Sequence, residues 1–177
     1  MAVTGEAHPL TEAQSGLWYA QRLDPANPLF NTGQYIELNG PLDLPAFEAA
    51  LAQAVSEADA LSLRMIDDPA GPLQVVDPAN RLVLDILDVS GAPDPLATAQ
   101  ADIARDMATP IDPTSEKLAA ERLFVLGPER HIWQQRIHHL AIDGYGMILL
   151  TQRVAELYNA RLRGMEAGAP PPGFAVV

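Results

Sequence analysis

Apolar positions recur at helical spacing in four segments of the chain, each bounded by residues that begin or end helices. In the first segment Thr11 is followed three residues later by Gln14, which is the pattern of a capping box. The second segment follows Asp43, a good N-cap, and the fourth ends at Gly164, a good C-cap. The predicted helices cover about residues 11–23, 43–60, 94–108 and 144–164.

Shorter segments between the helices have the apolar character of strands and are separated by turn-forming residues. The turn-rich stretches "DDPAG" and "GPER" each lie between two such segments, so two hairpins are predicted. Hairpins that alternate with helices predict a mixed β-sheet with helices packed on it, an α/β sandwich rather than a doubly wound parallel sheet. The predicted strands cover about residues 34–40, 61–66, 73–77, 82–89, 120–126 and 131–137.

Composition narrows the classes of function. The chain has 177 residues, 48% of them apolar, which suits one globular domain with a real core. Its 23 acidic and 11 basic residues give a net charge of −12, which disfavours nucleic acids and anionic membrane surfaces as partners. The absence of cysteine excludes disulfides, thiolate metal sites and cysteine nucleophiles. Neither a membrane span nor a secretory signal is visible, so a cytoplasmic protein is expected.

The stretch "RIHHLAIDGYG" contains the candidate chemistry: His138, His139 and Asp143 at a predicted strand end, followed by Gly144 and Gly146. A purely structural reading is open for each, because strand-end histidines often bond to the backbone and an aspartate there can cap the next helix. Adjacent residues of a strand face opposite sides of the sheet, so at most one of the two histidines faces a given cleft. The glycines leave the backbone open to close approach by a substrate.

Three other kinds of site fit the sequence poorly. A metal site needs three or four converging ligands, and the other histidines, His8 and His131, are not at ligand-like spacing. A serine hydrolase needs a nucleophile in a Gly-x-Ser-x-Gly context, whereas Ser15 lies inside a predicted helix. No phosphate-binding loop is present either. A histidine acting on an incoming nucleophile remains, with Asp143 fixing the local structure, and this chemistry suits acyl transfer to an amine or hydroxyl.

The stretch "HHLAIDG" resembles the His-His-x-x-x-Asp-Gly signature of condensation domains from non-ribosomal peptide synthetases, relatives of chloramphenicol acetyltransferase. Three other segments are similar to that family in the same order: "LTEAQSGLWYAQRLDPANPLFN", "ADALSLRM" and "TPIDPTSEKLAAERLFVLGPERHIWQQRIHH". The resemblance covers roughly residues 9–164 and implies a chloramphenicol acetyltransferase-like α/β sandwich lobe.

The resemblance also implies an activity and a role for each site residue. Such domains form an amide bond between a donor acyl group and an acceptor amine, both carried as thioesters on the phosphopantetheine arms of carrier proteins, with no cofactor or metal bound directly. His139 would lie in the tunnel, either as the base or as the group that positions the amine, and His138 would be structural. Asp143 would form a salt bridge with Arg64, and Gly144 would let the substrate approach backbone N–H groups.

Some positions depart from the family pattern. Ser62 replaces a frequent arginine, Gly146 a common serine and Leu118 a common proline. The first histidine, His138, argues against the cyclising subtype, which has an aspartate there.

The family's two-lobed build implies that residues 1–166 are the N-terminal lobe and residues 167–177 a proline-rich linker towards an absent C-terminal lobe. The lobe alone is then expected to be inactive and to self-associate through its exposed inter-lobe face. Two alternatives stay open: a non-catalytic module that recruits a carrier protein or tailoring enzyme, and a free-standing His-x-x-x-Asp acyltransferase.

Overall fold

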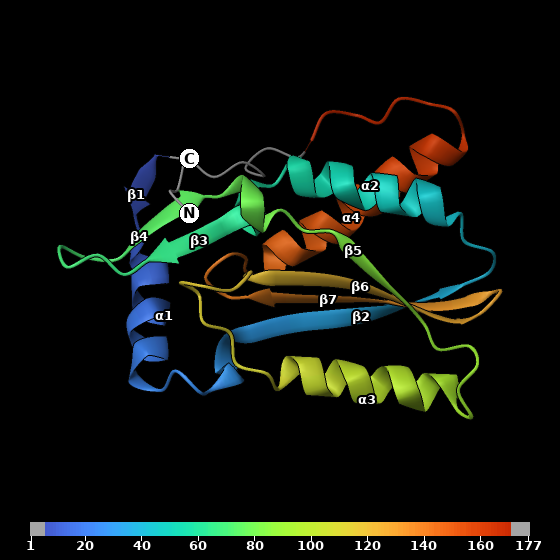
Figure 1. The fold of residues 1–177 in the computed structure, drawn as a ribbon. Helices are drawn as coiled ribbons and strands as arrows, with labels where there is room; N and C mark the ends of the chain where they lie inside the picture. Colours follow the sequence, from blue (N-terminus) through green and yellow to red (C-terminus); the bar gives the residue numbers. More distant parts are fainter. Residues whose placement is uncertain (1–5, 171–177) are drawn as a thin grey trace.

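The computed structural model describes residues 6–170. Its main sheet has four strands, and Figure 1 shows helices on both faces of this sheet. The strand order is β2-β7-β6-β5, and every pair is antiparallel except β5 and β6. Two helices, α2 and α4, cover one face and α3 covers the other (Figure 1). The elements are β2 (Asn31–Asn39), α2 (Leu44–Ser56), β5 (Leu84–Asp88), α3 (Pro95–Met107), β6 (Ala119–Gly127), β7 (Arg130–His138) and α4 (Gly144–Leu162).

A second, smaller sheet lies beside α1 (Glu12–Leu23). Its antiparallel strands are in the order β1-β4-β3, with β1 at Ala7–Pro9, β3 at Leu63–Ile66 and β4 at Leu73–Val76. The β3–β4 hairpin was predicted as part of one mixed sheet, whereas the structure places it in this separate sheet. The strand β1 was not predicted, because three residues that include a proline carry no alternation.

The helix boundaries follow from the caps that the sequence contains. Thr11 and Gln14 form the predicted capping box, and Asp43 accepts a hydrogen bond from the Ala46 N–H as an N-cap. Gly164 follows α4 with φ +62°, a backbone conformation that suits glycine after a helix. The helix α2 ends at Ser56, four residues before the predicted end, and a 3₁₀ turn at Asp59–Ser62 follows it.

Strand alternation divides the core into two layers. Trp133 and Ile137 of β7 face α2 and α4, where the Phe47 ring packs edge-on against Trp133 with centroids 5.3 Å apart. Ile132 faces α3 with Phe124 of the neighbouring strand β6. The same alternation continues to the end of β7, where the double histidine begins.

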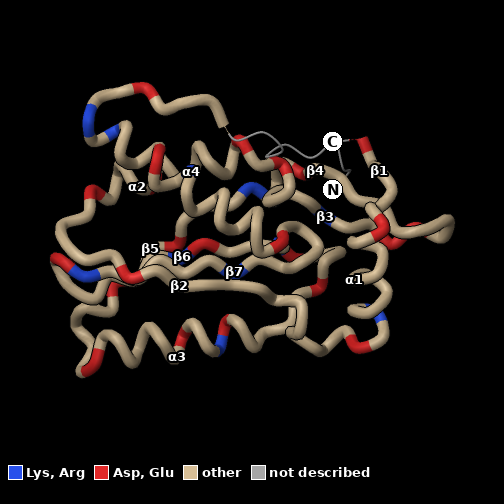
Figure 2. Tube along the Cα trace, turned by 180° about the vertical axis from the view of Figure 1, so that it is seen from behind, with Lys and Arg blue, Asp and Glu red and all other residues tan. Residues whose placement is uncertain are grey.

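Basic residues are spread singly along the chain in the view of Figure 2, between more numerous acidic ones. Within residues 6–170, no helix has both the length and the apolar character needed to cross a membrane. Residues 171–177, which make up most of the predicted linker, lie outside the described residues.

Candidate active site at the double histidine

The double histidine lies where β7 gives way to the loop that precedes α4. The backbone N–H of His138 donates to the Leu118 carbonyl at 2.7 Å, and the N–H of His139 donates to the Phe30 carbonyl at 2.8 Å. Successive N–H groups therefore bond to opposite sides of the chain, as in an extended strand. The backbone enters the loop already fixed by two separate segments.

His138 is a buried residue of the framework. Its side chain is 1% exposed, its Nδ1 accepts the Leu140 N–H at 3.2 Å, and its Nε2 lies 3.5 Å from Gln21 Oε1. Because Nδ1 accepts, the hydrogen-bond network assigns the proton to Nε2. Burial above all, and then the electrostatic influence of the neighbouring His139 and Arg136 side chains, lowers the pKa of His138 to about 4. The ring is therefore neutral near pH 7 and braces the loop.

His139 has the opposite environment. Its side chain is exposed at the position directly after β7, a strand in which neighbouring residues are buried on both faces of the sheet. Within residues 6–170 its imidazole has no hydrogen-bond partner, so both ring nitrogens are open to an incoming group. A histidine with an accessible nitrogen can accept a proton or hold a nucleophile.

Asp143 is the N-cap of α4. Its Oδ1 accepts the Gly146 N–H at 2.8 Å, and its backbone is extended with φ −99° and ψ 178°. The structure therefore shows Asp143 in the purely structural role that the sequence left open for it, that of a helix cap.

The predicted salt bridge between Asp143 and Arg64 is wrong. Arg64 forms its ion pair with Asp77. Arg64 lies opposite Val75 across the β3–β4 pair, and Asp77 is two residues further on, so its side chain is directed to the same face. This ion pair therefore stabilises the small sheet. It does not join Arg64 to the loop that carries His139.

The two glycines at the start of α4 have different surroundings. A Cβ at Gly144 would meet no heavy atom within 4 Å, so the backbone there is open on that side. A Cβ at Gly146 would lie 2.6 Å from Ile142 Cγ1, so any side chain at this position would force the Ile142 side chain to move. Only Gly144 has the open space that a substrate's approach to the backbone requires.

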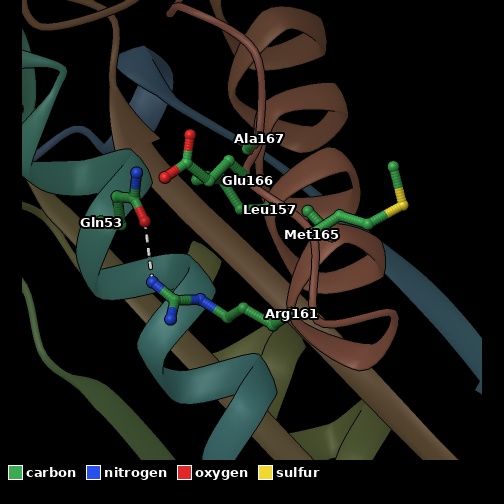
Figure 3. Close-up of a pocket in the computed structure, with 7 residues that line it drawn as sticks. Gln53, Leu157, Arg161, Met165, Glu166 and Ala167 are labelled. Carbon is green, nitrogen blue, oxygen red and sulfur yellow. Dashed lines mark hydrogen bonds between the residues drawn. The ribbon is translucent and has the colours of Figure 1, made fainter.

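Two cavities lie near the ends of α4, and one of them is lined by residues of the loop that follows His139. An apolar cavity of about 240 Å³ lies between the 3₁₀ turn at Asp59–Ser62 and the first turns of α4, and Leu61, Ile142 and Leu149 line it. A second cavity, of about 320 Å³, lies between α2 and the end of α4, as Figure 3 shows around Arg161 and Gln53. His139 lines neither of them.

Two polar features of the interior escaped the sequence analysis. Glu121 is 1% exposed, and its carboxyl accepts hydrogen bonds from Trp133 Nε1 at 2.7 Å and from Gln135 Nε2 at 3.4 Å. Burial raises the pKa of Glu121 to about 8 despite these bonds. Gln14, which the sequence indicated as part of a capping box and of the family-like opening helix, also donates to the Leu140 carbonyl beside His139. The alternation along "AERLFVL" could have indicated the inward direction of Glu121, because Leu123 shares its face.

No group of three or more histidine, cysteine, aspartate or glutamate residues in the described part of the chain is arranged to hold a metal ion. The loop holds His139 exposed directly after β7, whereas His138, the last residue of that strand, is buried.

Comparison with known proteins agrees with the fold. Residues 5–174 match the family described as Condensation domain. The chain is 46% identical over 160 residues to a dimodular nonribosomal peptide synthase of Bacillus subtilis (strain 168), covering 90% of this chain and 7% of that protein. It thus spans a small part of the curated relative.

Solved structures agree as well. A double mutant of the starter condensation domain of rhizomide synthetase, in complex with C8-CoA and Leu-SNAC, superposes with a TM-score of 0.87 at 36% identity, covering 92% of this chain and 37% of that one. The first condensation domain of the calcium-dependent antibiotic synthetase, in complex with a substrate analogue, gives 0.83 at 37% identity, with coverage of 94% and 40%. The predicted fold class, a chloramphenicol acetyltransferase-like α/β sandwich lobe, is confirmed.

Proposed function

The chain belongs to the condensation-domain family of non-ribosomal peptide synthetases, and from this premise we propose that it carries the histidine side of an amide-forming site. The donor is an acyl or aminoacyl thioester and the acceptor is an aminoacyl amine, each on the phosphopantetheine arm of a carrier protein. The ligands of the solved relative, C8-CoA and Leu-SNAC, fit these two classes.

One observation carries the proposal: the adjacent histidines have opposite environments. His138 is buried and neutral near pH 7, which suits a brace, whereas His139 is exposed with its backbone fixed on both sides. In the reaction the amine nitrogen attacks the thioester carbonyl, the C–N bond forms and the C–S bond breaks. The proton that leaves the amine ends on the departing thiolate. His139 acts on the amine, by accepting this proton or by holding the nitrogen in line.

The proposed site is completed by a second lobe. Residues 1–166 form the N-terminal lobe, which agrees with the 37–40% of the solved condensation domains that the chain covers. The lobe alone is therefore expected to form no amide, because the opposite wall of the tunnel comes from the C-terminal lobe. The carrier proteins would reach His139 from the two ends of the joined lobes.

The test uses a condensation domain that contains this chain and its C-terminal lobe, supplied with a donor and an acceptor thioester. Amide formation is measured by mass spectrometry for wild type, His139→Ala and the control His8→Ala, which removes an exposed histidine of β1. We expect His139→Ala to slow the reaction about 10²-fold or more, as loss of a positioned acid–base group does, and His8→Ala to match wild type. An undiminished rate in His139→Ala would instead favour a module that only recruits partners.

A further inference from the structure

The carbonyl of Leu140, the residue directly after His139, is held by a side chain from the start of the domain. Gln14 Nε2 donates a hydrogen bond to this carbonyl at 3.0 Å across 126 positions of sequence. Gln14 lies in the first turn of α1, so the bond joins α1 to the loop that carries His139. Gln14 therefore takes part in the capping box of α1 and also bonds to the candidate site.

The orientation of the Gln14 amide is fixed by all of its contacts. Its Oε1 accepts the Thr11 N–H at 3.0 Å, and Nε2 also donates to Gln74 Oε1 at 2.8 Å. Gln74 is itself buried, and its Nε2 donates to the Pro9 carbonyl at 3.2 Å. Turning either amide around would exchange donors for acceptors and break these bonds. Gln14 is therefore a rigid donor to Leu140.

This contact matters because no side chain in the described part of the structure bonds to the His139 imidazole. The placement of the ring is set by the backbone on either side: the His139 N–H bonds to Phe30, the Leu140 N–H to His138, and the Leu140 carbonyl to Gln14. We infer that Gln14 is a positioning residue for His139, acting through the Leu140 carbonyl; this rests on the proposed function of His139. A misplacement of about 1 Å can cost about 10²-fold in rate.

Substitutions at Gln14 can remove its donated hydrogen bonds while changing little else. Gln14→Glu keeps the length of the side chain and the capping box, because glutamate accepts the N-cap N–H at this position equally well. It removes both donated hydrogen bonds and places a carboxylate against the oxygens of Leu140 and Gln74. Gln14→Met removes the donor without adding charge. The matched control is Ser15→Ala, which removes a hydroxyl that donates only to the Thr11 carbonyl, at 2.9 Å.

The two-lobed condensation domain is assayed for kcat, for KM of the acceptor thioester and for Tm. We expect both Gln14 variants to lower kcat about tenfold or more with acceptor KM within about twofold, since ring placement acts on the transition state. Ser15→Ala should keep the wild-type kcat, and the Gln14 variants should melt within a few degrees of it. If Gln14→Glu does not fold, Gln14→Met provides the same measurement.

Other results would overturn the inference. A kcat within twofold of the control in the folded Gln14 variants, or a loss confined to Tm or to KM, would make Gln14 a structural residue only. His139→Ala in the same assay distinguishes a failure of the positioning role of Gln14 from a failure of the proposed function of His139. If His139→Ala is slow and the Gln14 variants are not, the positioning role alone fails; if His139→Ala matches wild type, the proposed function fails.

Discussion

The guanidinium of Arg64 pairs with the carboxylate of Asp77. Both residues belong to the β3–β4 hairpin and the turn after it, and the Asp77 side chain is 9% exposed. Asp77 Oδ1 also accepts the Ala79 N–H at 2.9 Å, so the carboxylate joins the hairpin to the segment that follows. The ion pair therefore stabilises the small sheet, and the cap formed by Asp143 holds the start of α4 separately.

A double-mutant cycle in urea separates these two carboxylates. Combining Arg64→Met with Asp77→Asn should give a coupling free energy of about 1–3 kcal/mol, because the two side chains contact each other. Combining Arg64→Met with Asp143→Asn should give additivity within about 0.5 kcal/mol. Asp143→Ala alone should cost about 1 kcal/mol as a lost N-cap. A larger coupling of Arg64 to Asp143 than to Asp77 would restore the salt bridge that the family pattern implies.

His138 should make the protein sensitive to acid. Burial lowers its folded-state pKa to about 4, below the ordinary value of 6.5, so the unfolded chain binds the proton first as the pH falls. The stability that this residue contributes is complete above pH 6.5 and is lost as the pH falls through about 4, at most about 3 kcal/mol.

The variant His138→Asn can still accept the Leu140 N–H and does not titrate. Its urea midpoint should therefore lack this part of the decline between pH 6.5 and 4, although it starts from a lower stability. The exposed His8→Asn is the control. A decline in His138→Asn as steep as that of wild type would mean that other groups cause the acid sensitivity.

Glu121 should give the protein a pH dependence of stability opposite to that of His138. Burial raises its folded-state pKa from 4.5 to about 8, so the folded protein retains the proton longer than the unfolded chain. The stability associated with the neutral carboxyl is complete below about pH 4.5 and is lost as the pH rises to about 8, up to about 5 kcal/mol.

Glu121→Gln keeps an oxygen that accepts the Trp133 indole N–H and cannot ionise. The variant should unfold at higher urea than wild type at pH 8 and lose this advantage towards pH 5. Glu48→Gln, an exposed position on α2, is the control. Equal pH profiles for Glu121→Gln and wild type would show that the buried carboxyl is not neutral at pH 7.

Local signals in the sequence predicted most of the fold. The capping box of Thr11 and Gln14, the N-cap at Asp43 and the glycine at Gly164 each act within one helical turn, so their effect can be read from neighbouring residues. Strand alternation likewise predicted that His138 and His139 have different surroundings, and one is buried while the other is exposed.

Contacts between distant segments were the ones missed. The strand β1 is defined by its register with β4, where Ala7 lies opposite Val75, and its three residues carry no pattern of their own. Gln14 meets Leu140 only because α1 and the end of β7 lie side by side. The ion-pair partner of Arg64 depends on which sheet the β3–β4 hairpin belongs to. Alternation within a strand does not specify the sheet.

The glycines of α4 allow stability and reactivity to be separated at neighbouring positions. A methyl group at Gly146 would lie 2.6 Å from Ile142 Cγ1 and 3.2 Å from its Cδ1, whereas at Gly144 it would meet nothing within 4 Å. Gly146→Ala should therefore lower the free energy of unfolding by about 1–2 kcal/mol, since overpacking exceeds the gain in helix propensity. Adding Ile142→Ala should make the clash disappear, so the double mutant should be more stable than the sum of the single changes predicts.

Gly144→Ala should leave the urea midpoint unchanged or slightly raised, because its methyl group points into open space at the first residue of α4. If substrate approaches the backbone there, as the proposed function requires, the same methyl group should lower kcat/KM for amide formation in the two-lobed domain. Since folding is unaffected, this loss would come from the occupied space alone. A Gly144→Ala domain with wild-type kcat/KM would place the thioester elsewhere around His139.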